Sequence, residues 1–452
     1  MIRRYKINIY YAIYVSLSIL NIFLSYKKGI SYLVYPMAFM LIIYKMFKIL
    51  NNEEFLLYSL FIPNKYIQLL SVLLFLVFEN KLISKKLRIN EIIFIIYIFT
   101  IGLLNCCIYD GIIIAVLFQT CVYYCILRSL DTFNMKFSED TILSVFDKMF
   151  FLQIITVTIE YLITHETADA LTGTMISAHY LGVFLCIYAY VLFKNIARIK
   201  NFMFIIKIVL MLLVLYFSDA KHVIAIFVFS VFLSKLYSVF RVKRKLLCTM
   251  IFMTLLICIT LVLIEKGVLS LNSNIFVTYV MNSQYNKKIQ LYTSTFKKLI
   301  GINGLFGYGV GLFGSHICLT LAKGIIYSWD SSLSNYIFAI SPYKQVVDGL
   351  MTEWYTIYGI PNSSMVLSYP LVSYIPLVAE LGLFGLVMFM NILDRNFKDC
   401  KCIFVIAFLF LTNFDTYFEI PCVFILILIA ENISKRKPIR RPNIVSVEGE
   451  II

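Results

Sequence analysis

The sequence has few charged residues for its length. Asp, Glu, Lys and Arg make up only 14% of the 452 residues, whereas hydrophobic residues make up 61% and the mean hydropathy is +0.87. A globule of this size cannot bury so much apolar surface, which excludes an ordinary soluble protein. Apolar runs of roughly 17–25 residues, each able to cross ~30 Å of hydrocarbon as helix, recur along the chain, without the alternation of barrel strands. The sequence therefore predicts an all-α polytopic membrane protein.

The sequence also lacks a cysteine framework, a continuous basic face and a signal cleavage site. Most of the 11 cysteines lie inside apolar runs, without zinc spacing or extracytoplasmic pairs, so we interpret them as packing residues. Lys and Arg do not line one solvated face but cluster between apolar runs, so the net charge of +15 does not indicate a nucleic-acid partner. No small-residue cleavage site follows the first apolar run, which we expect to be an anchor rather than a removed signal.

The apolar runs predict roughly 12–13 transmembrane helices. The candidate spans are residues 8–24, 31–49, a segment that ends near 78 and is broken at Pro63, 91–108, 112–127, 142–163, 176–193, 202–217, 222–240, 247–264, 371–393, 403–413 and 417–430. Basic links at 81–88, 194–200, 241–245, 395–401 and 435–441 fit the cytoplasmic side under the positive-inside rule. Before Lys81 the parity of crossings fails, and whether Pro63 divides two short segments stays open.

These spans divide the chain into four parts. They are an N-terminal transmembrane bundle (1–264), an extracytoplasmic loop (265–370), C-terminal transmembrane helices (371–431) and a cytoplasmic basic tail (432–452). The loop is the only long polar interval, so we expect any chemistry to occur there.

Histidine and arginine are scarce on the predicted outer face. The four histidines all fall on or just inside that face: His165, His179, His222 and His316. No arginine occurs between Arg244 and Arg395, so an anion there must be held by Lys, His, backbone amides or helix N-termini. Lys221 follows so short a link that its charge sits at the membrane boundary, where ionisable groups are usually functional.

Several of the candidate residues also have a simpler, structural interpretation. Lys221 fits a snorkelling lysine that marks a helix end. His179 fits a packed, hydrogen-bonded histidine. Lys344 and Asp348 are spaced to pair on the surface of an amphipathic helix in the loop.

The first part of the loop has the stripe of an amphipathic helix. Apolar and aromatic residues recur at steps of four and three, opposite a face with Lys287, Lys288, Lys297 and Lys298. Such a helix either lies on anionic lipid nonspecifically or uses one lysine to neutralise a diphosphate. The glycine cluster at 301–314 permits close approach of backbone to a ligand or another helix, but it lacks the βαβ setting of a nucleotide fingerprint.

Five segments, taken in order, resemble motifs of the O-antigen polymerase and ligase superfamily, over roughly the last two thirds of the chain. They are Thr-Gly-Thr-Met at 172–175 before a span, Ser-Asp-Ala-Lys at 218–221, Lys-Ile-Gln-Leu-Tyr at 288–292, Gly-Tyr-Gly-Val-Gly at 307–311 and Glu-Leu-Gly-Leu-Phe-Gly at 380–385. Lysine replaces the family's arginine at Lys221 and Lys288. No histidine precedes Glu380 where ligases carry one, which favours a Wzy-type polymerase over a ligase.

The resemblance implies a GT-C-like glycosyltransferase of the bacterial cytoplasmic (inner) membrane that acts in lipopolysaccharide or capsule biosynthesis. It would join undecaprenyl-diphosphate-linked repeat units on the outer face of that membrane, with a flippase and a chain-length regulator as partners. No cofactor is implied. No metal is expected either, because the outer loop has no Asp-x-Asp and family members work without one.

The implied reaction needs cations for the departing diphosphate and a base for the acceptor hydroxyl. Lys221 and Lys288 are the leaving-group candidates, and His222 and His316 are the candidate bases, with Glu353 or Asp330 as alternatives. The expected substrate-binding residues are His179, Lys287, Gly309, Gly311, Asp330 and Lys344.

Two other functions remain. A flippase or other transporter is disfavoured because we find no convincing repeat and because the charges appear at the ends of spans. A structural or interaction membrane protein predicts that every ionisable position of the loop tolerates substitution.

Overall fold

The chain is an all-α membrane protein. The computed structural model describes residues 2–28, 33–79, 87–109, 113–132, 138–167, 171–175, 177–196, 199–218, 220–265, 292–313, 373–398, 400–413 and 421–435, and these contain helices and links but no strand. Within these ranges, six helices are long and apolar enough to cross a membrane, and five shorter apolar helices accompany them. The expected count of 12–13 spans and the GT-C likeness stay predictions, and most of the 265–370 loop and of the tail lies outside the described residues.

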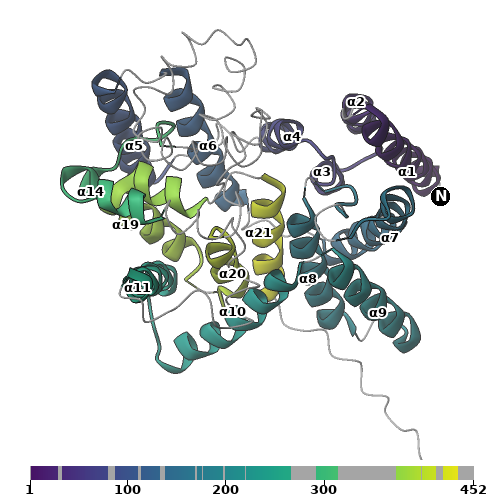
Figure 1. Cartoon of the computed structure of the whole chain (residues 1–452). Coiled ribbons are helices and arrows are strands. Elements are labelled where there is room, and N and C mark those ends of the chain that lie inside the picture. Colours follow the sequence, from purple (N-terminus) through teal and green to yellow (C-terminus); the bar gives the residue numbers. More distant parts are fainter. Residues whose placement is uncertain are drawn as a thin grey trace, which may run out of the picture. The chain divides into compact units, whose positions relative to one another are not determined.

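The helices form two compact units, which are described separately (Figure 1). Unit 1 contains α1 (Ile2–Lys28), α2 (Val34–Met46), α3 (Asn52–Ser59), α4 (Lys65–Phe78), α7 (Glu139–Thr164), α8 (Ala178–Lys194), α9 (Asn201–Phe217) and α21 (Pro421–Lys435). Unit 2 contains α5 (Ile89–Ile108), α6 (Ile113–Thr132), α11 (Lys245–Glu265), α14 (Ile302–Phe306), α19 (Tyr374–Asn396) and α20 (Ile403–Leu411). Helix α10 (Lys221–Val239) passes from the first unit to the second.

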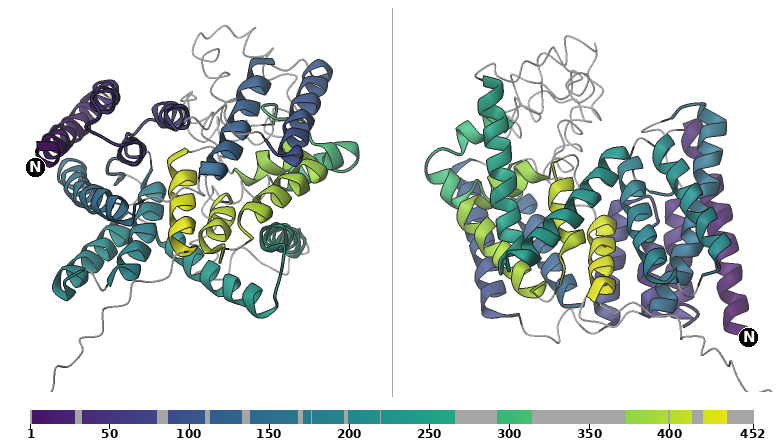
Figure 2. Two further views of the ribbon diagram at one scale, coloured as in Figure 1. Left: turned by 180° about the vertical axis from the view of Figure 1, so that it is seen from behind. Right: turned by 90° about the horizontal axis from the view of Figure 1, so that it is seen from below.

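Helix α8 is the centre of unit 1. It contacts α7, α9 and α21, and most of its side chains are buried, including Phe184 and Tyr188. Its neighbours run roughly along one direction in Figure 2 (right). Aromatic rings hold α8 to α7, with Phe150 stacked on Tyr188 at 4.8 Å between centroids. An all-round apolar helix such as α8 is one that packs inside a bundle.

Contacts within unit 1 show which helix ends lie together. Glu53 at the start of α3 accepts a hydrogen bond from the amide of Ser138, just before α7 (3.0 Å). Tyr10 of α1 packs its ring against Tyr44 at the end of α2 (5.0 Å). Lys194 at the end of α8 donates to a carbonyl near the end of α21. The starts of α1 and α7 and the ends of α8 and α21 therefore share one end, here called the basic end of unit 1, as the positive-inside pattern predicts for one membrane side.

Pro63 does divide two short segments. Helix α3 stops at Ser59 and α4 begins at Lys65, and the two are antiparallel because Phe55 packs on Phe78 (5.6 Å) while Gln68 donates to the carbonyl of Leu60 (3.1 Å). The pair starts and finishes at the basic end of unit 1. It therefore adds no net passage from one end of unit 1 to the other.

In unit 2, too, contacts show which helix ends lie together. Helices α5 and α19 are antiparallel, with Phe94 stacked on Phe389 (5.5 Å) and Tyr97 beside Leu381. Asp394 near the end of α19 accepts hydrogen bonds from the first amides of α11, at 2.8 and 3.1 Å. The start of α5, the start of α11 and the end of α19 thus gather at one end of unit 2. The glycine segment that follows α14 lies toward the other end.

Candidate functional site

The described residues contain five of the predicted site residues. His179, His222 and the backbone of Lys221 belong to unit 1, and Gly309 and Gly311 belong to unit 2. The side chain of Lys221 lies outside the described part of the chain. So do the remaining candidates: Lys287, Lys288, His316, Asp330, Lys344 and Glu353.

The structure brings His179 and His222 into contact. Their rings meet edge to face with centroids 4.6 Å apart and planes at 77°. Each lies in the first turn of its helix, His179 in α8 and His222 in α10. Ser177 caps α8 by accepting a hydrogen bond from the amide of His179 (3.1 Å). The sequence placed both histidines near the same face, but it gave no signal that they touch.

Small residues bring the two helix starts together. A side chain at Gly182 would place its Cβ 2.6 Å from the Cβ of Ala220, in the turn before α10. Only glycine fits there, and Ala220 is fully buried. The N-terminal ends of α8 and α10 therefore converge, and the aligned dipoles of both helices favour an anion.

Along the direction of α7, the histidine pair lies short of the C-terminal end of that helix. Tyr188 bonds to Asp147 of α7, and nine residues of helix, about 13 Å, separate Tyr188 from His179. The same length along antiparallel α7 ends well before Thr164. The link between the helices agrees, because Thr174 donates its amide to Gln153 in the middle of α7 (2.8 Å). The expected outer-face link thus runs back along α7, and His179 lies inside the bundle.

Glu160 is a buried carboxylate that the sequence reasoning missed. It accepts hydrogen bonds from the amide of Gly173 (2.8 Å) and the hydroxyl of Thr172 (3.0 Å). Gly173 has a φ of +63°, and a Cβ there would lie 2.2 Å from Gln153, so this position requires glycine. The signal was present in the sequence, since a carboxylate inside an apolar run is costly unless it is satisfied.

In unit 2, the predicted glycine motif binds the predicted Glu-Leu-Gly motif. The segment 307–313, called the glycine loop below, lies against α19: the amide of Tyr308 bonds to the carbonyl of Ala379 (2.8 Å) and that of Gly309 to the carbonyl of Glu380 (3.1 Å). Helix α19 is interrupted at Gly382, whose φ is +63°. Two motifs about 70 residues apart in sequence therefore form one structure.

The Glu380 carboxylate fixes the far part of the loop. It is 2% exposed and accepts hydrogen bonds from the amides of Gly311 (3.0 Å) and Phe313 (3.1 Å). Tyr97 donates to the carbonyls of Phe306 (2.8 Å) and Leu381 (3.1 Å), bridging the two motifs. Glu380 is thus a structural anchor for backbone amides, a role that its place in the motif did not reveal.

The glycines permit close backbone approach. A Cβ at Gly309 would lie 2.8 Å from the Cα of Gly102 in α5, and one at Gly311 would lie 2.6 Å from the carbonyl oxygen of Ala115 in α6. The prediction that the glycines allow close packing on another helix is confirmed. Their expected contact with a ligand stays a prediction.

Two described residues of unit 2, Tyr292 and Phe313, lie close in sequence to candidates outside the described ranges. The Tyr292 hydroxyl donates to Asn413 (3.0 Å), and burial raises the pKa of this phenol well above its ordinary value, so it stays protonated. Lys288 precedes Tyr292 by four residues and His316 follows Phe313 by three, and both candidates lie outside the described residues.

No known family model, curated protein or solved structure matches the chain.

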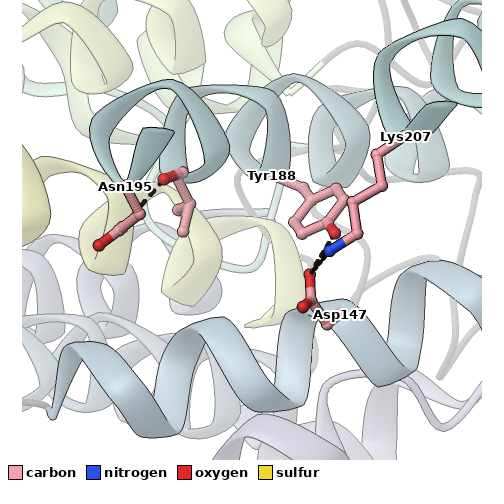
Figure 3. Close-up of polar contacts among 5 residues, drawn as sticks. Asp147, Tyr188, Asn195 and Lys207 are labelled. Atoms are coloured by element: carbon pink, nitrogen blue, oxygen red, sulfur yellow. Dashed lines mark hydrogen bonds and ion pairs between the residues drawn. The ribbon is translucent and has the colours of Figure 1, made fainter. Parts of the chain in front are cut away.

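An ion pair crosses the inside of unit 1 (Figure 3). Lys207 of α9 donates to Asp147 of α7 at 2.8 Å, and the Tyr188 hydroxyl of α8 donates to the same carboxylate oxygen. Lys207 is 5% exposed. Asn195 in the same view only closes the end of α8, by donating to the carbonyl of Val191 (3.0 Å). The statement that charges lie only at span ends is wrong for these residues, because both fall inside predicted spans.

Proposed function

We propose that the chain is a membrane glycosyltransferase that polymerises polyprenyl-diphosphate-linked repeat units on the outer face of a bacterial cytoplasmic membrane. The bond from the anomeric carbon of the growing glycan to the diphosphate breaks, and a bond from that carbon to an acceptor hydroxyl forms. The acceptor proton passes to a base, and the polyprenyl diphosphate leaves with its charge.

One observation supports this proposal most: His179 and His222 are in contact where two helix N-termini converge. Two dipole ends and the adjacent Lys221 suit a diphosphate, and an imidazole suits the acid or base role. Both histidines are half-buried.

The glycine loop supports the proposal in a second way. Transferases need their reacting groups held in place, and the anchored loop ends three residues before His316.

The experiment supplies purified protein with polyprenyl-diphosphate-linked repeat units and follows the product ladder and the released polyprenyl diphosphate. Lys221→Ala and His222→Gln are each expected to slow chain extension about a hundredfold or more, the typical effect of losing charge stabilisation or a general base. Lys200→Gln, an exposed lysine at the basic end of unit 1, is the matched control. Normal long polymer from both active-site variants would contradict the proposed roles, and no polymer from the wild type would contradict the function.

A transporter of lipid-linked glycans is the second candidate, and the partly buried Asp147–Lys207 pair favours it, because ionisable residues inside spans often mark transport pathways. A deletion strain separates the two functions. Loss of a polymerase leaves a single repeat unit capped on its acceptor, whereas loss of a flippase leaves none exported.

A further inference from the structure

A polar pocket lies at the basic end of unit 1, away from the histidine pair. Its volume is about 520 Å³. Its walls come from the end of α2, the start of α3 and the end of α4, and its lining residues are Lys45, Lys48, Leu50, Asn51, Asn52, Glu53 and Glu79. Two lysines and two glutamates give the lining no formal net charge. Lys45 and Lys48 are called its cationic pole below, and Glu79 its anionic pole.

The side-chain amide of Asn52 lies between the two poles and bonds to both. Lys45 donates to the side-chain oxygen of Asn52, and the Asn52 nitrogen donates to Glu79. Asn52 is therefore fixed with its acceptor toward the cation and its donor toward the carboxylate. Glu79 lies just past the end of α4, where the helix dipole adds negative potential.

Lys48 is held in an unfavourable backbone conformation. It follows the end of α2 with a φ of +56°, a left-handed position that glycine usually occupies. The turn is closed by the amides of Ile49 and Leu50, which both bond to the carbonyl of Tyr44 (3.0 and 3.3 Å). The ammonium of Lys48 makes no hydrogen bond or ion pair with a residue that the structure describes. Backbone strain that keeps a cation at a pocket is a pattern of binding sites.

Apolar side chains surround the pocket on the outside. Met46 and Phe47, between the two lysines, are 73% and 74% exposed, and Val77 and Phe78 beside Glu79 are also exposed. In a membrane protein, exposed side chains of this kind face lipid. The pocket is thus polar inside and borders the hydrocarbon, so its occupant needs a charged headgroup and acyl chains.

We propose that this pocket binds the headgroup of an aminophospholipid, phosphatidylethanolamine, from the leaflet at the basic end of unit 1. The phosphate bonds to Lys48 and Lys45, and the primary ammonium bonds to Glu79. A headgroup with both charges matches the two poles, whereas a purely anionic headgroup would place a negative charge at Glu79. Phosphatidylcholine fits less well, because its quaternary ammonium has no N–H to donate to the carboxylate.

The test measures retained lipid on the full-length protein by native mass spectrometry after extraction from defined vesicles. The vesicles contain phosphatidylglycerol with either phosphatidylethanolamine or phosphatidylcholine. The wild type is expected to retain phosphatidylethanolamine at least about tenfold better than phosphatidylcholine, the factor that one charge-assisted hydrogen bond supplies. Equal retention of the two lipids overturns the proposal.

Two variants test the poles. Glu79→Gln is expected to lose the preference for the primary ammonium, and Lys48→Gly to lose retention of the lipid. Lys48→Gly is informative because glycine relieves the strain, so its melting temperature in phosphatidylcholine should equal or exceed that of the wild type. Lys200→Gln is the control and should behave like the wild type. Unchanged retention in both pole variants overturns the proposal.

A third arm separates lipid from free headgroup. Soluble glycerophosphoethanolamine is added to the protein in phosphatidylcholine vesicles, and the melting temperature is measured. Phosphatidylethanolamine in the vesicle should raise the melting temperature, and the soluble headgroup at the same concentration should not. An equal rise with both overturns the assignment of a lipid occupant.

Discussion

Glu380 shows what a single buried side chain does in this molecule. Its carboxylate accepts two amide hydrogen bonds, from Gly311 and Phe313, while its own carbonyl accepts a third from Gly309. A buried carboxylate is tolerated only when it is satisfied in this way. The residue therefore determines where the glycine loop ends.

Glu380→Gln should destabilise the protein. The amide side chain offers one acceptor in place of two and brings donors that face backbone N–H groups, so the expected cost is about 2–3 kcal/mol. Thermal unfolding of the purified protein measures it. The control is Glu166→Gln, an exposed carboxylate whose loss should shift the melting temperature little. A Glu380 variant as stable as this control would contradict the anchoring role.

Gly311→Ala and Gly301→Ala form a matched pair at the same scale. Both glycines have positive φ, +80° and +106°, so alanine strains both by about 1–2 kcal/mol. Only at Gly311 would the new Cβ also meet backbone, 2.6 Å from the carbonyl oxygen of Ala115, whereas nothing lies within 4 Å at Gly301. Gly311→Ala should therefore lower the melting temperature clearly more than Gly301→Ala. Equal effects would mean that the loop does not pack on α6.

Residue types alone predicted part of the site. The glycine and Glu-Leu-Gly motifs and the two histidines were all recognised in the sequence. Their contacts were not, because a contact between residues 43 or 69 positions apart depends on how helices pack. Glu160 and Asp147 were missed although their charges stand inside apolar runs, where the hydropathy average hides a single carboxylate.

At the scale of elements, most helix positions followed from hydropathy. The predicted spans 142–163, 202–217 and 247–264 correspond to α7 (Glu139–Thr164), α9 (Asn201–Phe217) and α11 (Lys245–Glu265). A backbone in hydrocarbon must satisfy its own polar groups, so a long apolar run has little choice but helix. The α3–α4 pair was left undecided because proline gives the place of a break, not the direction in which the chain continues.

The ion pair between α7 and α9 gives the prediction for elements. Lys207→Met should cost roughly 2–3 kcal/mol, because it leaves Asp147 without its cation in a site that is only partly open to water. The double variant Lys207→Met with Asp147→Asn should regain most of that stability, since no unpaired charge remains. A double-mutant cycle by thermal unfolding measures the coupling. Additive losses would contradict the pairing seen in Figure 3.

For the whole molecule, the two units share one rule: basic links gather at one end of each. Lys245 donates to the carbonyl of Cys400 (2.8 Å), which places the links around 243 and 401 together in unit 2. Composition predicted this grouping through the positive-inside rule. It did not predict the division into units, which mixes early and late helices.

Orientation is testable with reporter fusions. Fusions after Lys243 and after Lys401 should both report the cytoplasm, and a fusion after Glu166 should report the outer side. The measurement compares a reporter that is active only outside with one that fluoresces only inside. Opposite results at Lys243 and Lys401 would contradict the shared end of unit 2. Matching results at Glu166 and Lys243 would contradict the orientation.

The bond between Gly311 and Glu380 also sets an order for biogenesis. The glycine loop leaves the ribosome 69 residues before its anchor, about 3–14 s earlier at typical synthesis rates. During that interval α5 and α6 are already made, but the carboxylate that fastens the loop between them does not yet exist. In a nascent chain arrested before residue 380, the glycine loop would therefore lack its anchor. Quality-control proteases would be able to cleave it there.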